Sequence, residues 1–287
     1  MHVGFCYSRI REDEKLLLNE LESRGHAVTR IDVRNPAFGL DDTEPPGVLD
    51  GVDLALNRCQ ESSRVRYVSR FCEEYGVPVV NDAETTAVCA DKVRGSLALR
   101  AADVPTPRTE VAFDRETALD IADRFGYPCV LKPVTGSWGR LVARLDTRAA
   151  AEGMFEHKEV LGSYEHKVFY VQEFVAKPGR DIRVVAADGE PVAAMYRSSA
   201  HWITNAAKGG EVSACTVDDE MRDLVARASE AVGGGLLGVD LMETPDADEP
   251  YTVHEVNGTC EFKALNTVAE RDVPGAAVDW LETRAGA

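Results

Sequence analysis

Three oxygen-bearing side chains lie close together near the end of the sequence. Asp240 stands within the apolar run 238–242, where a lone carboxylate loses hydration energy unless a cation or a donor pairs with it. Glu255 and Asn257 are two residues apart in a second strand-like run, so their side chains face the same way. Carboxylate and amide oxygens are the ligands that Mg²⁺ prefers. The pattern favours a metal site over a row of surface acids, provided that the strand register places Asp240 on the same face as Glu255.

A lysine and a small glycine-containing stretch suggest a phosphate site. Lys132 ends the apolar run 129–131 and is followed by Pro133 and the stretch 135–140, which contains two glycines. Glycines let backbone N–H groups approach a phosphate closely. The residue order is not that of a Walker A loop, and taken alone the stretch favours an ordinary turn. Lys92, taken alone, has the pattern of a surface lysine.

Basic residues recur later in the chain. Arg183 and Arg197 stand in strand-like sequence, where an unpaired guanidinium is costly, and arginine is suited to bidentate contacts with phosphate or carboxylate. For Lys177 and Arg180 we favour salt bridges with the many acidic residues. No Ser-His-Asp or Cys-His arrangement is legible, so the pattern indicates no protein nucleophile.

The elements that must position these residues follow an α/β pattern. The first third alternates strands and helices, which predicts a parallel sheet, and it lacks a GxGxxG dinucleotide motif. Further along, a hairpin is predicted to turn at Asp188-Gly189. The predicted strands are 3–7, 26–33, 52–56, 109–113, 128–132, 168–175, 180–187, 191–197, 237–243 and 251–257. The predicted helices are 15–23, 67–75, 91–102, 115–125, 218–231 and 275–283.

Composition narrows the class of protein. The net charge of −17, from 32 Lys+Arg against 49 Asp+Glu, argues against nucleic-acid binding through a basic face. No apolar stretch approaches the roughly 18 residues that span a bilayer, and no basic leader precedes the first strand, so we expect a soluble cytoplasmic protein with no membrane partner. The seven cysteines have no CxxC spacing, which favours reduced thiols. Such an acidic chain also suits a high-salt cytoplasm, which stays a hypothesis.

Six longer strings carry a family signature. They are Asn57-Arg58-Cys59, the KPVTGSWGR string at 132–140, EHKEVLG at 156–162, KPGRDIR at 177–183, SAHWITN at 199–205, and EVNGTCEFK at 255–263. Together they resemble the LysX/ArgX family of RimK-like ATP-grasp ligases, over nearly the whole chain.

The resemblance implies a fold and a division of the chain. The fold is α/β (α+β), an ATP-grasp fold with an N-terminal Rossmann-like pre-ATP-grasp domain. The implied units are a pre-ATP-grasp domain at 1–88, a central ATP-grasp subdomain at 89–167 and a C-terminal ATP-grasp subdomain at 168–287. The resemblance further suggests a dimer or tetramer.

The same resemblance implies roles for individual residues. ATP and Mg²⁺, with two ions expected, are the implied cofactors, and Asp240, Glu255 and Asn257 are the implied metal ligands. Arg197 and Lys132 are the implied catalytic residues, which offset charge on the transferring phosphoryl group. The implied ATP-binding residues are Lys92, Lys132, Gly136, Ser137, Trp138, Gly139, Arg140, Gln172, Glu173, Phe174, Val175, Asp181, Arg183, Arg197 and Asn205.

The implied reaction joins the α-amino group of glutamate or α-aminoadipate to the C-terminal glutamate of a small acidic carrier protein, LysW. The residues after Asn257 lean towards glutamate, although a difference of one methylene is worth only about 1–3 kcal/mol in a pocket. A basic patch that includes Arg58 and Arg64 is expected to receive the carrier. Two alternatives stay open: a RimK-type ligase that adds glutamate to another protein or cofactor, and an inactive nucleotide sensor.

Overall fold

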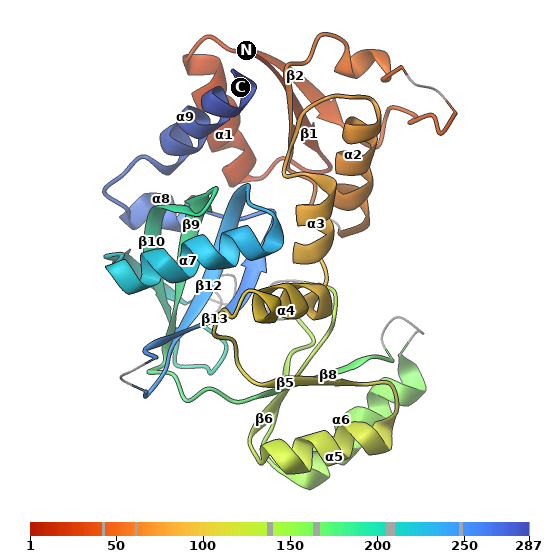
Figure 1. Cartoon of the computed structure of the whole chain (residues 1–287), viewed down its shortest axis with the longest axis vertical. Coiled ribbons are helices and arrows are strands. Elements are labelled where there is room, and N and C mark those ends of the chain that lie inside the picture. The colour runs from red at the N-terminus through yellow and green to blue at the C-terminus, as the bar shows by residue number, and fades with distance from the viewer. Residues whose placement is uncertain are drawn as a thin grey trace.

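Three β-sheets follow one another along the long axis of the molecule (Figure 1). The computed structural model describes residues 1–41, 44–60, 62–136, 140–162, 167–204, 210–246 and 249–286, with no side chain for Ser62. The N-terminal sheet lies at one end, the C-terminal sheet in the middle and the central sheet at the other end. The mixed helix and strand content confirms the predicted fold class.

The N-terminal sheet is parallel, as the alternating pattern predicts, with strand order β2-β1-β3-β4. The inner strands are almost wholly buried because helices cover both faces. Its strands are β1 (His2–Tyr7), β2 (Ala27–Asp32), β3 (Leu54–Asn57) and β4 (Val79–Val80). Its helices are α1 (Glu12–Ser23), the short 3₁₀ helix η1 (Gly47–Leu49), α2 (Ser62–Glu74) and α3 (Ala83–Cys89).

The central sheet has the order β5-β8-β6-β7. Phe155 and Phe169 meet edge to face in the core beneath its two covering helices. The strands are β5 (Thr109–Ala112), β6 (Cys129–Lys132), β7 (Ala143–Leu145) and β8 (Phe169–Glu173), and the covering helices are α5 (Arg115–Phe125) and α6 (Arg148–Leu161). Because β8 pairs with β5 and β6, the central sheet extends to Glu173, past the boundary at 167/168 expected from the sequence.

The C-terminal sheet is antiparallel in the order β11-β10-β9-β12-β13. The hairpin between β9 and β10 turns at Asp188-Gly189 as predicted, and both residues have positive φ (45° and 84°). The strands are β9 (Arg180–Ala187), β10 (Glu190–Ser198), β11 (Glu211–Cys215), β12 (Leu236–Glu243) and β13 (Tyr251–Asn257). Helices α4 (Lys92–Ala101) and α7 (Asp219–Val232) pack on one face, and α8 (Lys263–Val268) and α9 (Val273–Ala285) lie on the other.

The N-terminal and C-terminal sheets share one hydrophobic core. Side chains of β1, β3 and α1 form a single cluster with those of β9, β12, α8 and α9. Figure 1 shows α9 returning beside α1, so that the two chain ends lie near each other. The two sheets are therefore joined by apolar packing and not by a linker alone.

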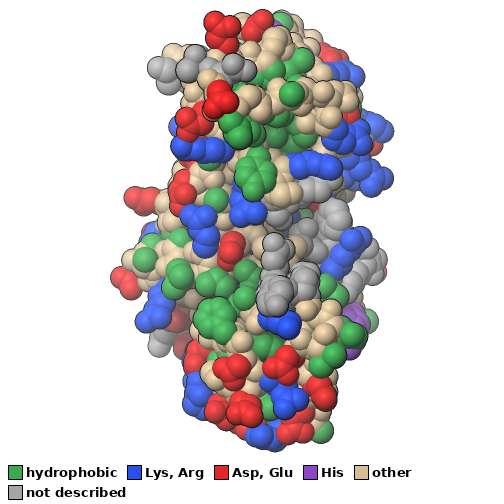
Figure 2. Space-filling model, turned by 90° about the vertical axis from the view of Figure 1, so that its right-hand side faces the viewer, with side chains coloured by type: hydrophobic (Ala, Val, Ile, Leu, Met, Phe, Trp, Pro, Cys, Tyr) green, Lys and Arg blue, Asp and Glu red, His purple; other side chains and the backbone are tan. Residues whose placement is uncertain are grey.

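Charge is unevenly distributed over the surface. Figure 2 shows acidic side chains crowding the lower end of one face, which the central sheet and its helices form, and more Lys and Arg side chains higher up. Helix α5 alone exposes Glu116, Asp120 and Asp123. No helix in the described ranges is long and apolar enough to cross a membrane.

Asn81 fastens the N-terminal sheet to the start of β12. Its side chain accepts a hydrogen bond from the Leu236 amide (2.7 Å) and donates to the Leu236 carbonyl (3.0 Å). Gly235 precedes this contact with φ of 103°, and a Cβ there would collide with Asn81 Oδ1.

We predict that Gly235→Ala lowers the free energy of unfolding by about 2–4 kcal/mol, because it adds backbone strain and displaces the Asn81 bonds. Urea denaturation measures the change. The matched control is Gly153→Ala in α6, where a Cβ meets nothing within 4 Å and φ is not positive; it should stabilise by about 0.5–1 kcal/mol. Equal effects of the two substitutions would contradict the prediction.

Candidate active site

A cleft of about 610 Å³ collects most of the residues singled out from the sequence. Its walls come from the central and C-terminal sheets and from helices α1, α2 and α3 beside the N-terminal sheet. The sequence-predicted residues that line it are Lys92, Lys132, Gly136, Arg140, Gln172, Glu173, Phe174, Val175, Asp181, Arg183, Arg197, Asp240, Glu255 and Asn257. Ser137, Trp138, Gly139 and Asn205 lie outside the described residues.

The strand register brings the oxygen-bearing trio together. Asp240 of β12 lies directly opposite Glu255 of β13, and directly opposed residues of antiparallel strands project to the same face. Asn257 follows Glu255 by two residues and shares that face. The condition on which the sequence prediction depended is met.

A β-bulge adds a fourth side chain to the same wall. The pairing shifts from Asp240 opposite Glu255 to Leu241 opposite Val253, so His254 is the extra residue on β13. His254 lines the cleft beside Glu255. Simple alternation would have turned His254 to the opposite face, and for this reason the sequence gives no signal for it.

Asp240 is buried and is compensated by two arginines. Arg183 forms a bidentate pair with it, with Nη2 2.7 Å from Oδ2, and Arg197 Nη2 lies 2.9 Å from Oδ1. Although burial opposes ionisation, the two guanidinium groups hold the pKa of Asp240 well below its usual range. Arg197 also donates to Asp181 over 2.6 Å. The arginines that would be costly if unpaired are thus paired with carboxylates.

Lys92 is part of the site and not a surface lysine. Its side chain is 12% exposed, and its ammonium group lies 3.1 Å from Glu255 Oε1. It also donates to the Gly136 carbonyl over 2.8 Å, so it connects the glycine-containing stretch to Glu255 of β13. The sequence around Lys92 could not predict these contacts, because the two partners are 44 and 163 residues away along the chain.

Lys132 lies at the centre of the cleft wall. Its ammonium group donates to Gln172 Oε1 and lies 3.3 Å from the nearer nitrogen of His254. Burial lowers the pKa of Lys132 to about 7, and burial together with this lysine holds the pKa of His254 well below its usual value. His254 is therefore neutral at pH 7 in this cleft.

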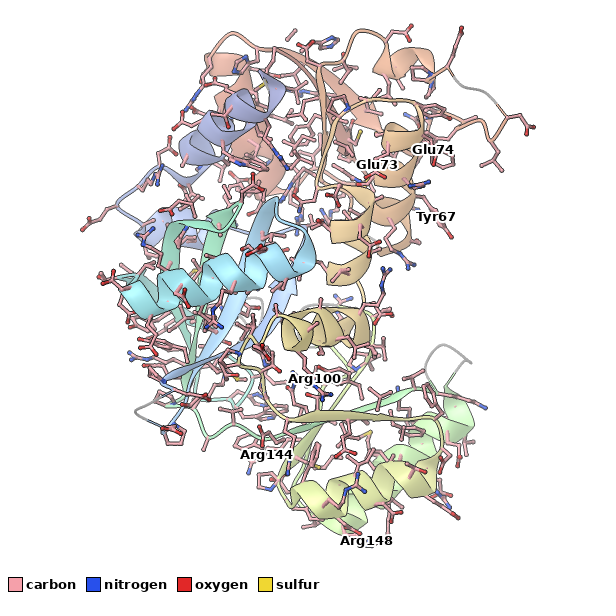
Figure 3. The ribbon with its side chains drawn as sticks, viewed as in Figure 1. Tyr67, Glu73, Glu74, Arg100, Arg144 and Arg148 are labelled. Atoms are coloured by element: carbon pink, nitrogen blue, oxygen red, sulfur yellow. The ribbon has the colours of Figure 1, made fainter. Side chains whose placement is uncertain are left out.

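The strand end at Gln172–Val175 connects the central sheet to the C-terminal sheet. Gln172 is fixed by a hydrogen bond from its amide nitrogen to Thr109 (2.8 Å). Phe174 packs between Trp202, with ring centroids 6.4 Å apart, and Arg144, whose guanidinium carbon lies 4.7 Å from the ring centre. Figure 3 shows Arg144 on the central unit, on the side nearest the C-terminal sheet. The segment thus has the position of a hinge that lines one end of the cleft.

Several basic residues have roles other than phosphate binding. Arg180 pairs with Glu243 over 2.6 Å, as favoured from the sequence, and Lys177 lies 3.4 Å from Asp181. The expectation that Arg58 belongs to a surface patch is wrong, because only 2% of it is exposed. Arg64 on α2 is exposed.

The donor set of the trio is suited to a hard divalent cation. It offers two carboxylates and one amide on neighbouring strands. The Asn257 amide nitrogen donates to Gly238 and to Asp240 (both 3.3 Å), and no hydrogen bond to its oxygen is found in the described part of the chain. A cation bound to these oxygens would neutralise phosphate charge next to Lys92 and Lys132.

We predict that Asp240→Asn and Glu255→Gln differ in their effect on stability. Arg183 pairs with no carboxylate other than Asp240 among the described residues, so Asp240→Asn should cost about 3–5 kcal/mol of unfolding free energy. Lys92 keeps a second partner, the Gly136 carbonyl, and Glu255 is 22% exposed, so Glu255→Gln should cost less, about 1 kcal/mol. Urea denaturation in EDTA measures both changes, and equal costs would refute the assignment.

We predict a pH dependence of stability that comes from Lys132. Its pKa is about 7 in the folded protein against 10.5 as a free side chain, so between these values the unfolded chain binds more protons and stability rises with pH. Lys132→Met should remove this rise. Urea midpoints at pH 7.5 and 9.5, compared between wild type and variant, give the measurement; identical pH slopes would contradict it.

The chain matches known families along its length. Residues 3–88 match the LysX preATP-grasp domain and residues 89–281 the RimK-like ATP-grasp domain. The α-aminoadipate–LysW ligase LysX of Saccharolobus solfataricus is 35% identical, over 90% of this chain and 92% of that protein. The glutamate–LysW ligase ArgX of Sulfolobus acidocaldarius is 29% identical, over 98% of both chains.

A solved structure agrees with this assignment. The crystal structure of a RimK domain ATP-grasp protein from Sphaerobacter thermophilus has a TM-score of 0.81 and 27% identity, over 98% of this chain and 99% of that one. These matches confirm the family predicted from the sequence. The chain belongs to the LysX/ArgX group of RimK-like ATP-grasp proteins, which are ATP-dependent carboxylate–amine ligases.

Proposed function

We propose that this ligase joins the α-amino group of glutamate, α-aminoadipate or both to the C-terminal glutamate of a LysW-type carrier protein, in arginine or lysine biosynthesis. The observation that carries the proposal is the similarity to LysX and ArgX over nearly the whole chain. The cleft supports it because Lys92 and Lys132 line it together with the three oxygen-bearing side chains of Asp240, Glu255 and Asn257.

The proposed chemistry needs no protein nucleophile. The terminal γ-carboxylate of the carrier attacks the γ-phosphorus of ATP, which forms an acyl phosphate and releases ADP. The amine then attacks the acyl carbon, and inorganic phosphate leaves as the amide forms. The residues of the chain position the groups and neutralise charge. We assign Mg²⁺, with two ions expected, to Asp240, Glu255 and Asn257, where it would offset phosphate charge.

Each cation in the cleft has a proposed task. Lys92 and Lys132 bind phosphate oxygens, and Arg197 offsets charge on the transferring group. Arg183 and Asp181 hold Asp240 and Arg197 in orientation through their ion pairs. The strand end at Gln172–Val175 binds the adenine, and Gly136 with Arg140 approaches the phosphates.

The amino-acid preference is the finer part of the proposal. Glutamate and α-aminoadipate differ by one methylene, which changes binding by about 1–3 kcal/mol. Relatives named for each substrate are similar to this chain. Residues 258–267, after the last metal ligand, lead us to favour glutamate, with measurable activity on α-aminoadipate.

We predict ATP-dependent ligation when purified enzyme is mixed with a LysW-type carrier, Mg²⁺ and glutamate. The carrier mass should rise by one glutamyl residue, with a second reaction testing α-aminoadipate. Glu255→Ala should lower turnover at least about 100-fold because the phosphate charge is no longer offset. Mass spectrometry of the carrier gives the readout. Modification of another protein or cofactor, with none of the carrier, would establish the RimK-type alternative.

A further inference from the structure

The residues that follow the metal ligand Asn257 are held by the N-terminal domain. We call residues 258–263 the post-ligand segment. Asn81 donates to the Gly258 carbonyl over 2.7 Å, and Arg58 Nη2 donates to the Cys260 carbonyl over 2.8 Å. The segment belongs in sequence to the ATP-grasp half of the chain, but these bonds fix it to the other half.

A carboxylate of α1 completes this attachment. Asp13 accepts hydrogen bonds from the backbone amides of Phe262 (2.7 Å) and Lys263 (2.8 Å). Asp13 is 4% exposed, so the bonds form away from solvent. The post-ligand segment is therefore held at its start by Asn81, in its middle by Arg58 and at its end by Asp13.

Arg58 is the unusual member of the set. It is 2% exposed and lies 3.2 Å from Glu14, whose side chain is completely buried. Its guanidinium also lies 5.9 Å from the Phe262 ring centre, and within the described ranges its Nε has no hydrogen-bond partner. A buried ion pair adds little net stability relative to apolar residues of similar size. The specific contribution of Arg58 is therefore its hold on the Cys260 carbonyl.

The post-ligand segment forms one end of the cleft. Gly258, Thr259 and Glu261 line the cleft beyond Asn257, and Gln60 of the N-terminal domain lines it as well. The hinge strand at Gln172–Val175 lines the same cleft from the central sheet. If the nucleotide extends from the hinge to the trio, the post-ligand segment lies next to the trio end, where the acyl phosphate would form and the amine would approach it.

We propose that Arg58 is a positioning residue for the amino-acid substrate, acting through the Cys260 carbonyl and the post-ligand segment. This inference rests on the proposed function. Arg58 does not touch the nucleotide-facing residues described above, so its loss should alter use of the amino acid and leave use of ATP unchanged.

The test compares Arg58→Met/Glu14→Gln with Glu14→Gln alone. The double variant removes both buried charges together, which avoids leaving one unpaired, and a glutamine at 14 still accepts the Arg11 amide bond (2.9 Å in the wild type). In the ligation reaction, kcat/KM for the amino acid should fall about 10–100-fold, while KM for ATP stays within about twofold. Glu14→Gln keeps the Cys260 bond but leaves the buried Arg58 without its carboxylate, so it should lower stability and still keep kcat/KM for the amino acid within about twofold of wild type.

A second readout does not depend on any substrate. Hydrogen exchange followed by mass spectrometry should show faster exchange in peptides covering 258–266 of the double variant, and unchanged exchange in β9. Val68→Ala, in the core between α2 and the N-terminal sheet, controls for loss of stability alone. It should leave both readouts at wild-type values.

The outcomes separate the two ideas. Unchanged exchange at 258–266, or equal changes in KM for ATP and for the amino acid, would overturn the role of Arg58. Absence of carrier ligation by the wild type would overturn the proposed function, while the exchange measurement would still decide whether Arg58 holds the post-ligand segment.

Discussion

The structure depends above all on the pairing of charges that are buried in the cleft wall. Asp240 is 5% exposed and stays ionised because Arg183 and Arg197 surround it. Each of these groups would be costly alone, and removing Asp240 would leave Arg183 without a carboxylate partner among the described residues. The cleft is therefore charged before any ligand arrives. In the proposed function these fixed charges stabilise the phosphate groups in place of water. The side chains are already in position, so they need little rearrangement during the reaction.

Strand pairing sets the geometry of that field. β12 carries Asp240 between β9 with Arg183 and β13 with Glu255, and direct opposition across the sheet puts all three on one face. The bulge at His254 then adds an imidazole to this face, next to Lys132 of the central sheet. Burial lowers the pKa of both Lys132 and His254. The charge of the cleft therefore depends on pH through two groups that belong to different sheets.

The N-terminal domain does more than support the ATP-grasp half. It shares a hydrophobic core with the C-terminal sheet, and its polar side chains form hydrogen bonds with the backbone of the post-ligand segment, residues 258–263. The same contacts explain why Arg58 is buried and not part of a surface patch. A residue whose type predicts solvent exposure can serve as an internal tie when a carbonyl and a carboxylate meet it.

The sequence by itself determined the family, the α/β class, the parallel first sheet, the hairpin at Asp188-Gly189, and the metal-ligand candidates, because these are carried by local strings and by alternation along a strand. Only the tertiary structure decided the rest. It joined Lys92 to Glu255, placed His254 in the cleft and buried Arg58 under the post-ligand segment. It also showed that β8 belongs to the central sheet and not to the C-terminal subdomain expected from the sequence. The reason is physical: local patterns report which face a side chain takes, whereas pairing partners, bulges and burial depend on contacts between residues tens to hundreds of positions apart.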